Sequence, residues 1–276
     1  MLYQILPRYD YRFNPDAMTM FLKTLSGTKK TESFIEQMKG MVKFTGNVLD
    51  YQFIVDCNGD DNTKGMISFY LQVKNEHSAP LVLNSLQNMF QEQADVFISG
   101  FHLEPYSTVH TLYKDDPGFH EQEKQLATWS DDKVFLFILG TMKNKTRITI
   151  DFSIKRSNTK QKHSYKGVTS DISAEVMIKV SAKTKYQRND IMEITNTIIS
   201  LTAGTQELKA RYRDIYRMTS MNSSELMNFI QIPTFYNKPS DLEVLLRINK
   251  LEVGQRTLSN QEFQKGIKCG TVYHPM

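Results

Sequence analysis

The sequence predicts an α+β protein of two ferredoxin-like units in tandem, each a hairpin, a helix and a further strand with an antiparallel sheet. Two observations lead to this prediction. Both halves of the chain contain pairs of segments with strand character, and an amphipathic helix follows each pair. A further short strand follows each helix, so the same order of elements occurs twice. The two copies share no useful sequence identity, so the repeat is one of element order only.

The chain begins with a predicted helix over residues 15–26. Asn14 is a favourable N-cap, Pro15 suits the first helical position, and Gly27 is a natural stop at the C-terminal end. A second short helix is expected over 32–38. These helices precede the first hairpin.

The first unit is expected to contain strands at 51–55 and 66–73, joined by turn residues at 58–62. A helix over 79–92 and a strand at 95–98 complete it. Residues 103–132 are polar and contain Pro105, Pro117 and Gly118, so they are expected to form an irregular connection with a short helix at 121–128. The predicted domains are therefore 1–132 and 133–276.

The second unit is expected to contain strands at 146–154 and 172–180, a helix over 188–201 and a last strand at 207–212. The first of these strands alternates with a period of two, which is typical of a strand with one buried face. The tail is expected to add a short helix at 224–229 and a strand at 243–248.

Composition excludes several classes of protein. Hydrophobic residues make up 40% and charged residues 23% of the 276 residues, which is typical of a globular protein. The start has no basic segment followed by an apolar run, so no signal peptide is expected. The densest apolar run, 134–139, is far shorter than the roughly 20 residues that span a bilayer. Cys57 and Cys269 lack CxxC spacing, which favours a reducing cytoplasm over a disulfide or zinc protein.

No catalytic motif is present. The chain contains neither G-x-x-x-x-G-K-[ST] nor G-x-G-x-x-G, so by itself it is not expected to bind a triphosphate in the P-loop manner. His102 and His110 lie near Asp115 and Asp116 in the sequence, and a metal-dependent hydrolase built on these four residues is the weakest alternative. Loop histidines near acids are more often plain surface groups.

Charge is distributed unevenly along the chain. Residues 1–150 hold 15 basic and 18 acidic residues, a net charge of −3, whereas residues 151–276 hold 19 basic and 12 acidic residues, a net charge of +7. The loop at 155–166 contains five Lys or Arg and no acid, so it is either a solvated loop or a contact for nucleic-acid phosphates. A second basic group follows the second helix. The residues expected to bind nucleic acid are Lys155, Arg156, Lys160, Lys162, Tyr165, Lys166, Arg211 and Arg213.

Five segments carry a resemblance to a known family. They are Ile5-Leu6-Pro7, the stretch 11–15 (Tyr-Arg-Phe-Asn-Pro), residues 20–27, residues 174–180 and the exit segment 266–276. The opening segments resemble the start of conjugative-transfer motor ATPases of the FtsK/HerA-type superfamily, found in type IV secretion and mobile elements of Gram-positive bacteria. The exit segment is similar to the one that leads into the motor domain of that family.

The resemblance implies that this chain is the N-terminal, non-motor region of such an ATPase, with docking and oligomerisation roles beside a hexameric motor. It implies no catalytic residue and no cofactor here, since ATP and Mg²⁺ belong to the motor domain. The expected partners are other secretion subunits or further protomers, and DNA over the basic half. The expected location is the cytoplasm, at the inner face of the cell membrane, without a span of its own. The alternative is a stand-alone, plasmid-encoded nucleic-acid-binding accessory protein.

Overall fold

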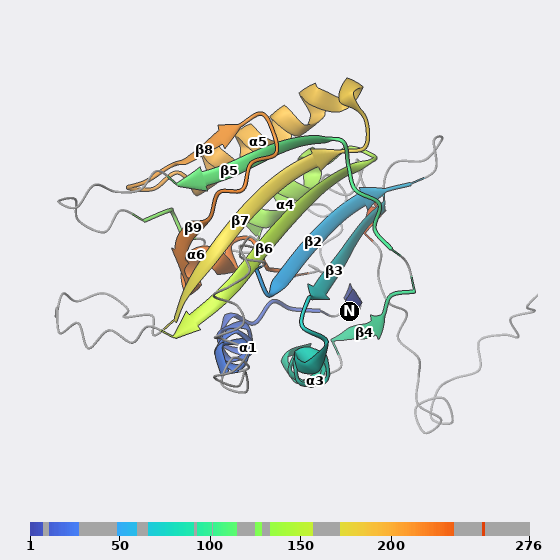
Figure 1. The fold of residues 1–276 in the computed structure, drawn as a ribbon, viewed down its shortest axis with the longest axis vertical. Helices are drawn as coiled ribbons and strands as arrows, with labels where there is room; N and C mark the ends of the chain where they lie inside the picture. The colour runs from blue at the N-terminus through green and yellow to red at the C-terminus, as the bar shows by residue number, and fades with distance from the viewer. Residues whose placement is uncertain are drawn as a thin grey trace, which may run out of the picture.

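A computed structural model describes residues 1–7, 11–27, 49–59, 66–90, 93–100, 102–114, 125–128, 133–156, 172–234 and 250–251. It confirms the α+β class. In place of two separate sheets, the described residues form one continuous sheet of ten strands (Figure 1). All of its pairings are antiparallel except that of β10 (Lys250–Leu251), which runs parallel to β3.

The first half of the sheet has the spatial order β4-β1-β3-β2. In this half a strand and a helix precede the predicted hairpin, and a second helix and strand follow it. The elements are β1 (Leu2–Pro7), α1 (Pro15–Gly27), β2 (Tyr51–Asn58), β3 (Met66–Val73), the 3-10 turn η2 (Glu76–Ser78), α3 (Ala79–Phe90) and β4 (Ala94–Ile98).

The second half has the order β6-β7-β5-β8, the same arrangement read from the opposite end. Each half thus runs strand, helix, strand, strand, helix, strand along the chain. A short strand, β9, pairs with β7 and leads into α6. The elements are β5 (Thr108–Lys114), α4 (Lys133–Thr141), β6 (Thr146–Arg156), β7 (Ile172–Ala182), the 3-10 turn η3 (Lys185–Gln187), α5 (Arg188–Thr202), β8 (Leu208–Arg211), β9 (Thr219–Asn222) and α6 (Ser223–Met227).

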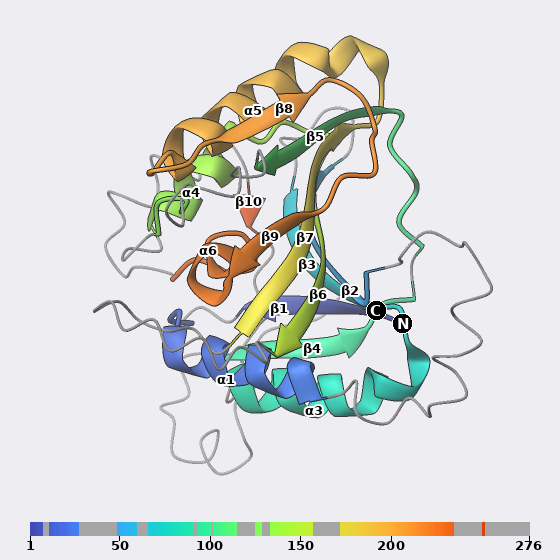
Figure 2. The same ribbon diagram turned by 60° about the vertical axis from the view of Figure 1, so that its left-hand side comes forward.

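The two halves meet at the pair β2–β6, which we call the seam. Its antiparallel register runs from Tyr51 opposite Phe152 to Cys57 opposite Thr146. The helices cover one face of the sheet, which we call the inner face (Figure 2). Helices α1 and α3 contact each other over the first half, and α4 and α5 do so over the second. The opposite face is the outer face.

The alternation of side chains along the strands explains why the helices lie on the inner face. On β6, Ile148, Ile150 and Phe152 are almost completely buried beneath the helices, whereas their neighbours Arg147 and Asp151 point to the outer face. On the other side of this core, the apolar stripe of α5 at Ile191, Ile194 and Ile198 packs against the sheet.

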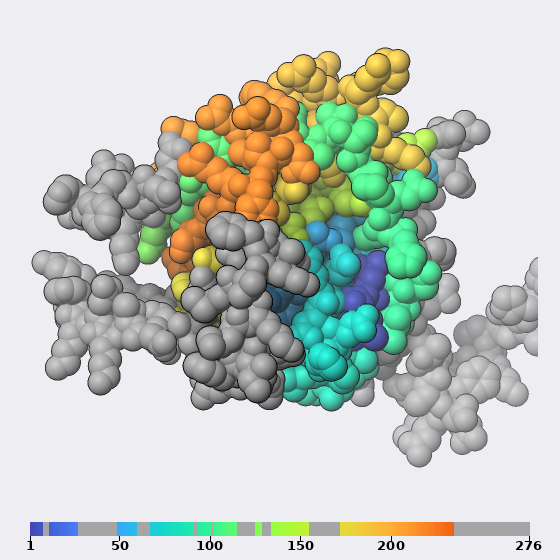
Figure 3. Space-filling view, in the orientation of Figure 1, coloured from blue at the N-terminus to red at the C-terminus, as the bar shows by residue number. Residues whose placement is uncertain are grey.

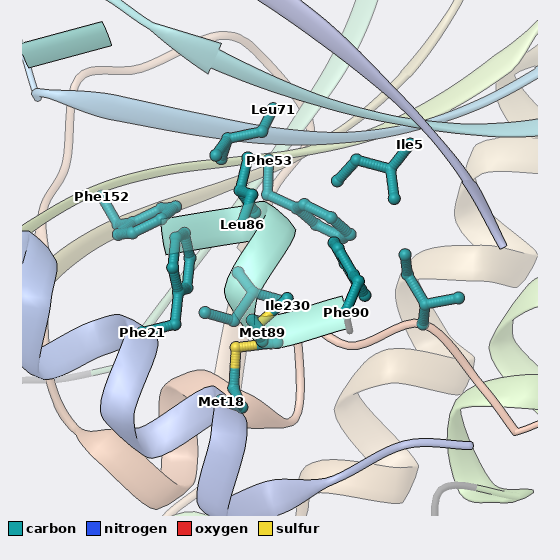
Figure 4. A pocket seen from close by; sticks show the side chains of 11 residues that line it. Ile5, Met18, Phe21, Phe53, Leu71, Leu86, Met89, Phe90, Phe152 and Ile230 are labelled. Atoms are coloured by element: carbon teal, nitrogen blue, oxygen red, sulfur yellow. The ribbon is translucent and has the colours of Figure 1, made fainter. Parts of the chain in front are cut away.

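Helix α6 and the residues after it fill the space between the two helix pairs. Helix α6 contacts both β7 and α1, and Phe229, Ile230 and Ile232 are at most 3% exposed. Between this segment and helices α1 and α3 is a cavity of about 20 Å³, room for about one water molecule, with an entirely apolar lining that includes Met18 and Met89 (Figure 4). The segment joins the cores of the two halves into one.

Most predicted elements are confirmed. Asn14 caps α1, since the backbone N–H groups of Asp16 and Ala17 donate to its Oδ1 at 3.0 and 3.1 Å. The two hairpins, the helices after them, the strands at 95–98 and 207–212 and the short helix near 224 are all present, with boundaries shifted by a few residues. The expected elements at 32–38 and 243–248 lie outside the described residues.

Residues 103–132 required the largest correction. This stretch was expected to be an irregular connection, yet β5 lies between β7 and β8 and so within the second half of the sheet. Thr108, His110 and Thr111 made it look polar, although His110, Thr111, Leu112 and Tyr113 are all buried. The expected helix at 121–128 is absent over its described part, 125–128. Strand β1 and helix α4, which forms from the apolar run at 134–139, were not among the predicted elements.

Candidate functional site

The outer face of the sheet carries the charged and aromatic groups that a binding site would use. Figure 3 looks onto this face. The segment after β8, in orange, and the connection that precedes β5, in green, lie over the sheet on either side of the seam strands. Two clusters of side chains, one at the seam and one beside β8, are built here.

The seam cluster consists of Asp56, Arg147 and Tyr106. Arg147 Nε donates to Asp56 Oδ1 at 2.8 Å, and both side chains are less than a tenth exposed. The Tyr106 ring lies on the guanidinium, 4.1 Å from its carbon to the ring centroid, and the Tyr106 hydroxyl donates to Asp56 at 3.3 Å. Arg147 Nη1 also donates to the carbonyl of Glu104 at 2.8 Å.

Burial and the Asp56 charge determine the chemistry of the seam cluster. Burial raises the pKa of the Tyr106 hydroxyl well above its usual range, and the neighbouring Asp56 carboxylate adds to this. Tyr106 is therefore a neutral hydrogen-bond donor and not a base. Since Asp56 and Arg147 use their charges on each other, the seam cluster connects strands and offers no nucleophile.

A second ion pair lies further along the same seam. Lys74 Nζ and Gln52 Nε2 both donate to Asp151 Oδ1 at 2.9 Å. Asp151 is 4% exposed, and these two donors bind its buried carboxylate beside β2. A buried carboxylate with a cation beside it is a structural ion pair in the first instance.

The basic cluster lies beside β8. Its members are Lys209 and Arg211 of β8 together with Arg213 and Arg217 of the segment that follows. Arg217 lies over the ring of Tyr113 at 3.9 Å, while Lys209, Arg211 and Arg213 are exposed. Exposed cations near aromatic rings match the chemistry of a phosphate backbone with stacking bases.

Hydrogen bonds to β5 and an ion pair to β7 hold this segment over the outer face. Thr111 Oγ1 donates to the carbonyl of Arg213 at 3.1 Å and accepts from the N–H of Ile215 at 3.2 Å. Lys179 of β7 forms an ion pair with Asp214 at 2.6 Å. Tyr216 is 55% exposed, and its pKa is raised by partial burial and then by the negative charges of Glu175 and Asp151. Acidic groups thus lie next to the basic cluster.

The sequence grouped the loop at 155–166 with Arg211 and Arg213 as one nucleic-acid-binding surface. Within the loop, the structure describes only the backbone of Lys155 and Arg156, which end β6. The remaining predicted loop residues lie outside the described part of the chain: Lys160, Lys162, Tyr165 and Lys166.

Arg211 and Arg213 lie well away from the end of β6. Arg211 pairs with Thr111, and through β5 and β7 this position is level with Thr149 on β6. Lys155 is six residues further along that strand, which corresponds to about 20 Å. The end of β6 and the basic cluster beside β8 are therefore at different positions along the sheet.

The histidine–carboxylate alternative is not supported. His110 is 1% exposed on β5, its Nδ1 lies 3.2 Å from Thr195 Oγ1, and the Tyr212 ring packs edge-on at 4.8 Å. Burial and the nearby Arg188 charge lower the His110 pKa. Asp115 and Asp116 lie outside the described residues, and His102 is exposed. Among the described residues no group of three or more His, Cys, Asp or Glu side chains could hold a metal ion.

Comparison with protein-family models, curated proteins and solved structures gives no match. Within the described parts of the chain, no helix is long and apolar enough to span a bilayer. The seam cluster was missed at the sequence level, because its partners are 91 residues apart and meet only through the β2–β6 register. The one signal in the sequence that could have indicated this cluster is a charged residue, Asp56 or Arg147, among the apolar residues of each strand.

Proposed function

We propose that this chain is the docking and oligomerisation domain of a conjugative DNA-transfer ATPase, located at its N-terminus and non-catalytic by itself. The family rests on the resemblance of the opening and exit segments. The docking role is supported by one structural observation: the sheet ends in two edge strands, β4 and β8, and large apolar side chains are exposed at one of them, with Phe97 at 42% and Ile98 at 60%. Exposed apolar groups beside a sheet edge favour protein contacts.

The finer fold assignment is part of the proposal. Each half is a ferredoxin-like β-α-β-β-α-β unit, and the two units are fused through their second strands. The spatial orders β4-β1-β3-β2 and β6-β7-β5-β8, with antiparallel pairing throughout, support this assignment. Such a fusion leaves the fourth strand of each unit at an end of the sheet.

The non-catalytic role is supported by how three buried carboxylates are used. Asp56, Asp151 and Glu225 are each at most 4% exposed and each bind a Lys or Arg at 2.8 to 3.0 Å. Each carboxylate thus connects two segments of the fold through its ion pair. The partners are other subunits of the secretion machine or further protomers, at the cytoplasmic face of the membrane.

The coding sequence after codon 276 tests this proposal directly. A P-loop motif in the same reading frame, a short distance downstream, would support a motor ATPase. A stop codon at that point would overturn the assignment. As a biochemical companion, the purified chain is expected to hydrolyse no ATP, whereas a longer product that includes the P-loop should do so.

The second candidate is a stand-alone nucleic-acid-binding accessory protein. The observation that favours it is the basic cluster beside β8, with exposed Lys209, Arg211 and Arg213. Replacing these three residues with Ala should then weaken binding of labelled single-stranded DNA. The slope of log binding constant against log salt concentration should become shallower by up to about three. The matched control is Lys183→Ala, which removes one exposed cation elsewhere. Unchanged affinity in the triple variant would remove this candidate.

A further inference from the structure

The two ends of the sheet have complementary geometry. The path from β4 to β8 contains eight strands, and every neighbouring pair along it is antiparallel. The first and eighth strands therefore run in opposite directions. When two copies with their sheets aligned the same way meet end to end, β4 of one is antiparallel to β8 of the next. Among the described residues no strand lies beyond either edge.

Two backbone hydrogen bonds determine which groups point outward at the β4 edge. Val73 N donates to Met1 O at 2.8 Å, and Ser99 N donates to Leu2 O at 2.9 Å. Since hydrogen-bonded and non-hydrogen-bonded pairs alternate in an antiparallel ladder, residues 95 and 97 bond toward β1. The N–H and C=O groups of Val96 and Ile98 therefore point away from the sheet.

The same reasoning applies at the β8 edge. Lys183 N donates to Lys145 O at 3.0 Å, one step beyond the Thr146–Ala182 pair. Hydrogen-bonded and non-hydrogen-bonded pairs alternate, so even residues of β7 bond toward β5 and odd residues of β5 bond toward β8. The odd residues of β8 therefore bond toward β5. The N–H and C=O groups of Leu208 and Ala210 therefore point outward.

The side chains at both edges have matching positions. Val96 packs against the core and Leu208 is 2% exposed, so the residues with outward backbone groups carry inner-face side chains at both edges. The outer-face residues are Asp95 and Phe97 on β4, and Lys209 and Arg211 on β8. Hydrogen-bonded partners in an antiparallel pair share a face, so apolar side chains would meet apolar ones at such a junction.

We infer that copies of this chain associate head to tail, β4 of one pairing with β8 of the next. This inference rests on the oligomerisation role proposed above. In the register that brings Asp95 opposite Arg211, Val96 lies opposite Ala210, and Ile98 opposite Leu208. On the outer face Asp95 lies opposite Arg211, and Phe97 lies opposite the Lys209 stem. Opposite charges directly across a ladder are favourable, whereas a β8–β8 junction would bring basic residues against each other.

This junction is heterologous, which distinguishes it from a two-fold dimer. Each copy keeps one unused edge after pairing, so the assembly grows into a ring or an open filament. The pairing would also cover the exposed Phe97 and Ile98.

Disulfide trapping between two variants, each with one introduced cysteine, tests the junction. Phe97→Cys and Lys209→Cys are made in a Cys269→Ser background, with Cys57 retained because it is fully buried. The two new cysteines would occupy a non-hydrogen-bonded pair with Cα atoms about 4.5 Å apart, within the range of a disulfide. The mixture should give a two-chain product on mild oxidation, and neither variant alone should.

The outcomes separate the alternatives. A product from Phe97→Cys alone would indicate a β4–β4 dimer and overturn the inference. No product above the level of a control mixture, Phe97→Cys with Glu193→Cys on the exposed face of α5, would also overturn it. A product from the matched mixture alone supports the junction.

Two further variants test the chemistry of the junction in the intact chain. The molecular mass in solution should rise with concentration above the 32.0 kDa of one chain. Val96→Pro should abolish this rise by removing an outward N–H, whereas Val96→Ala, which loses the same side chain but retains the N–H, should not. Asp95→Arg or Arg211→Asp alone should weaken association by about fivefold, and the double exchange should restore it. Equal association of the Pro and Ala variants, both folded by circular dichroism, would overturn the inference.

Failure of this inference is distinguishable from failure of the proposed function. A monomeric chain with an in-frame P-loop downstream would remove only the head-to-tail junction. A trapped head-to-tail product followed by a stop codon would remove only the ATPase assignment.

Discussion

Asp56 of β2 and Arg147 of β6 face each other across the seam, and their side chains form a buried ion pair at 2.8 Å. Arg147 also binds the carbonyl of Glu104 and packs against the Tyr106 ring. One guanidinium therefore connects both halves of the sheet with the segment that leads into β5. Because the charges are removed from water, neither partner is dispensable.

Arg147→Ala is expected to lower the free energy of unfolding by about 3–5 kcal/mol, since it leaves the Asp56 carboxylate buried without a cation. Urea unfolding followed by circular dichroism measures this loss. Lys183→Ala is the control, because its ion pair with Glu104 is at least half exposed and should contribute less than about 1 kcal/mol. Similar losses in the two variants would contradict the structural role given to the seam cluster.

Glu225→Ala is expected to loosen the segment between the helix pairs. The carboxylate binds Lys114 Nζ at 3.0 and 3.1 Å and accepts from the backbone N–H groups of Leu126 at 2.7 Å and Asn222 at 3.0 Å. Without it, hydrogen exchange over residues 223–232 should become faster, while exchange in β2 changes little. The control Glu193→Ala, at an exposed position with a partner at 3.9 Å, should leave exchange in 223–232 unaltered.

Stability is expected to decline on the acidic side of neutrality because of His110. Burial and Arg188 lower its pKa in the folded chain, so below about pH 6.5 the unfolded chain binds a proton that the folded chain does not. The His110 contribution is complete above that pH and decreases as the pH falls toward the folded-state pKa. Urea unfolding at pH 7.5 and 5.5 measures this decline. Between these two pH values, the free energy of unfolding should fall less for His110→Gln than for the wild type. A difference equal to that of the wild type would exclude His110 as a cause.

The Cys57 thiol is expected to be inert in the folded chain. It is fully buried on β2, and burial followed by the Asp56 charge raises its pKa to about 12. In a Cys269→Ser variant, a chromogenic thiol reagent at pH 8 should react only as fast as the seam opens. Arg147→Ala should accelerate this reaction, because it removes an ion pair one residue away. A rapid reaction of the folded Cys269→Ser protein would contradict the burial.

Gly204→Ala is expected to destabilise the chain, because a Cβ at this position would lie 2.5 Å from Ala127 N and 2.6 Å from Gln125 O. These are backbone atoms of a segment that hydrogen-bonds to Thr202 and Gln206, so the segment cannot move away from the added Cβ without losing these bonds. A loss of about 1–3 kcal/mol should appear in urea unfolding. Gly100→Ala is the control, since nothing lies within 4 Å of its added Cβ, and it should change little.

Local patterns in the sequence predicted most helices and both hairpins. The Asn14 cap, the Gly27 stop and the alternation along β6 each depend on residues close together in the chain, so a single segment contained enough information. Strand β5 was missed because Thr and His occupy its buried positions, where His110 Nδ1 meets Thr195 and the backbone near Arg213 satisfies the Thr111 hydroxyl. Such satisfaction depends on tertiary contacts.

The candidate site was harder to predict than the fold. The basic group beside β8 was recognised from its charges, but its separation from the end of β6 depends on strand order across β5 and β7. The seam cluster depends on the β2–β6 register, which links residues 91 positions apart. Register between distant strands is determined by the complete core, so no local segment specifies it.

The position of Ile230 and Ile232 between the helix pairs has a consequence for synthesis on the ribosome. The four strands β1 to β4 of the first half are complete by residue 98. The apolar faces of α1 and α3 that these two isoleucines cover then stay uncovered until another 134 residues have been synthesised, which takes about 7–27 s at ordinary elongation rates. Through that interval the nascent chain presents an apolar surface that a holding chaperone would recognise.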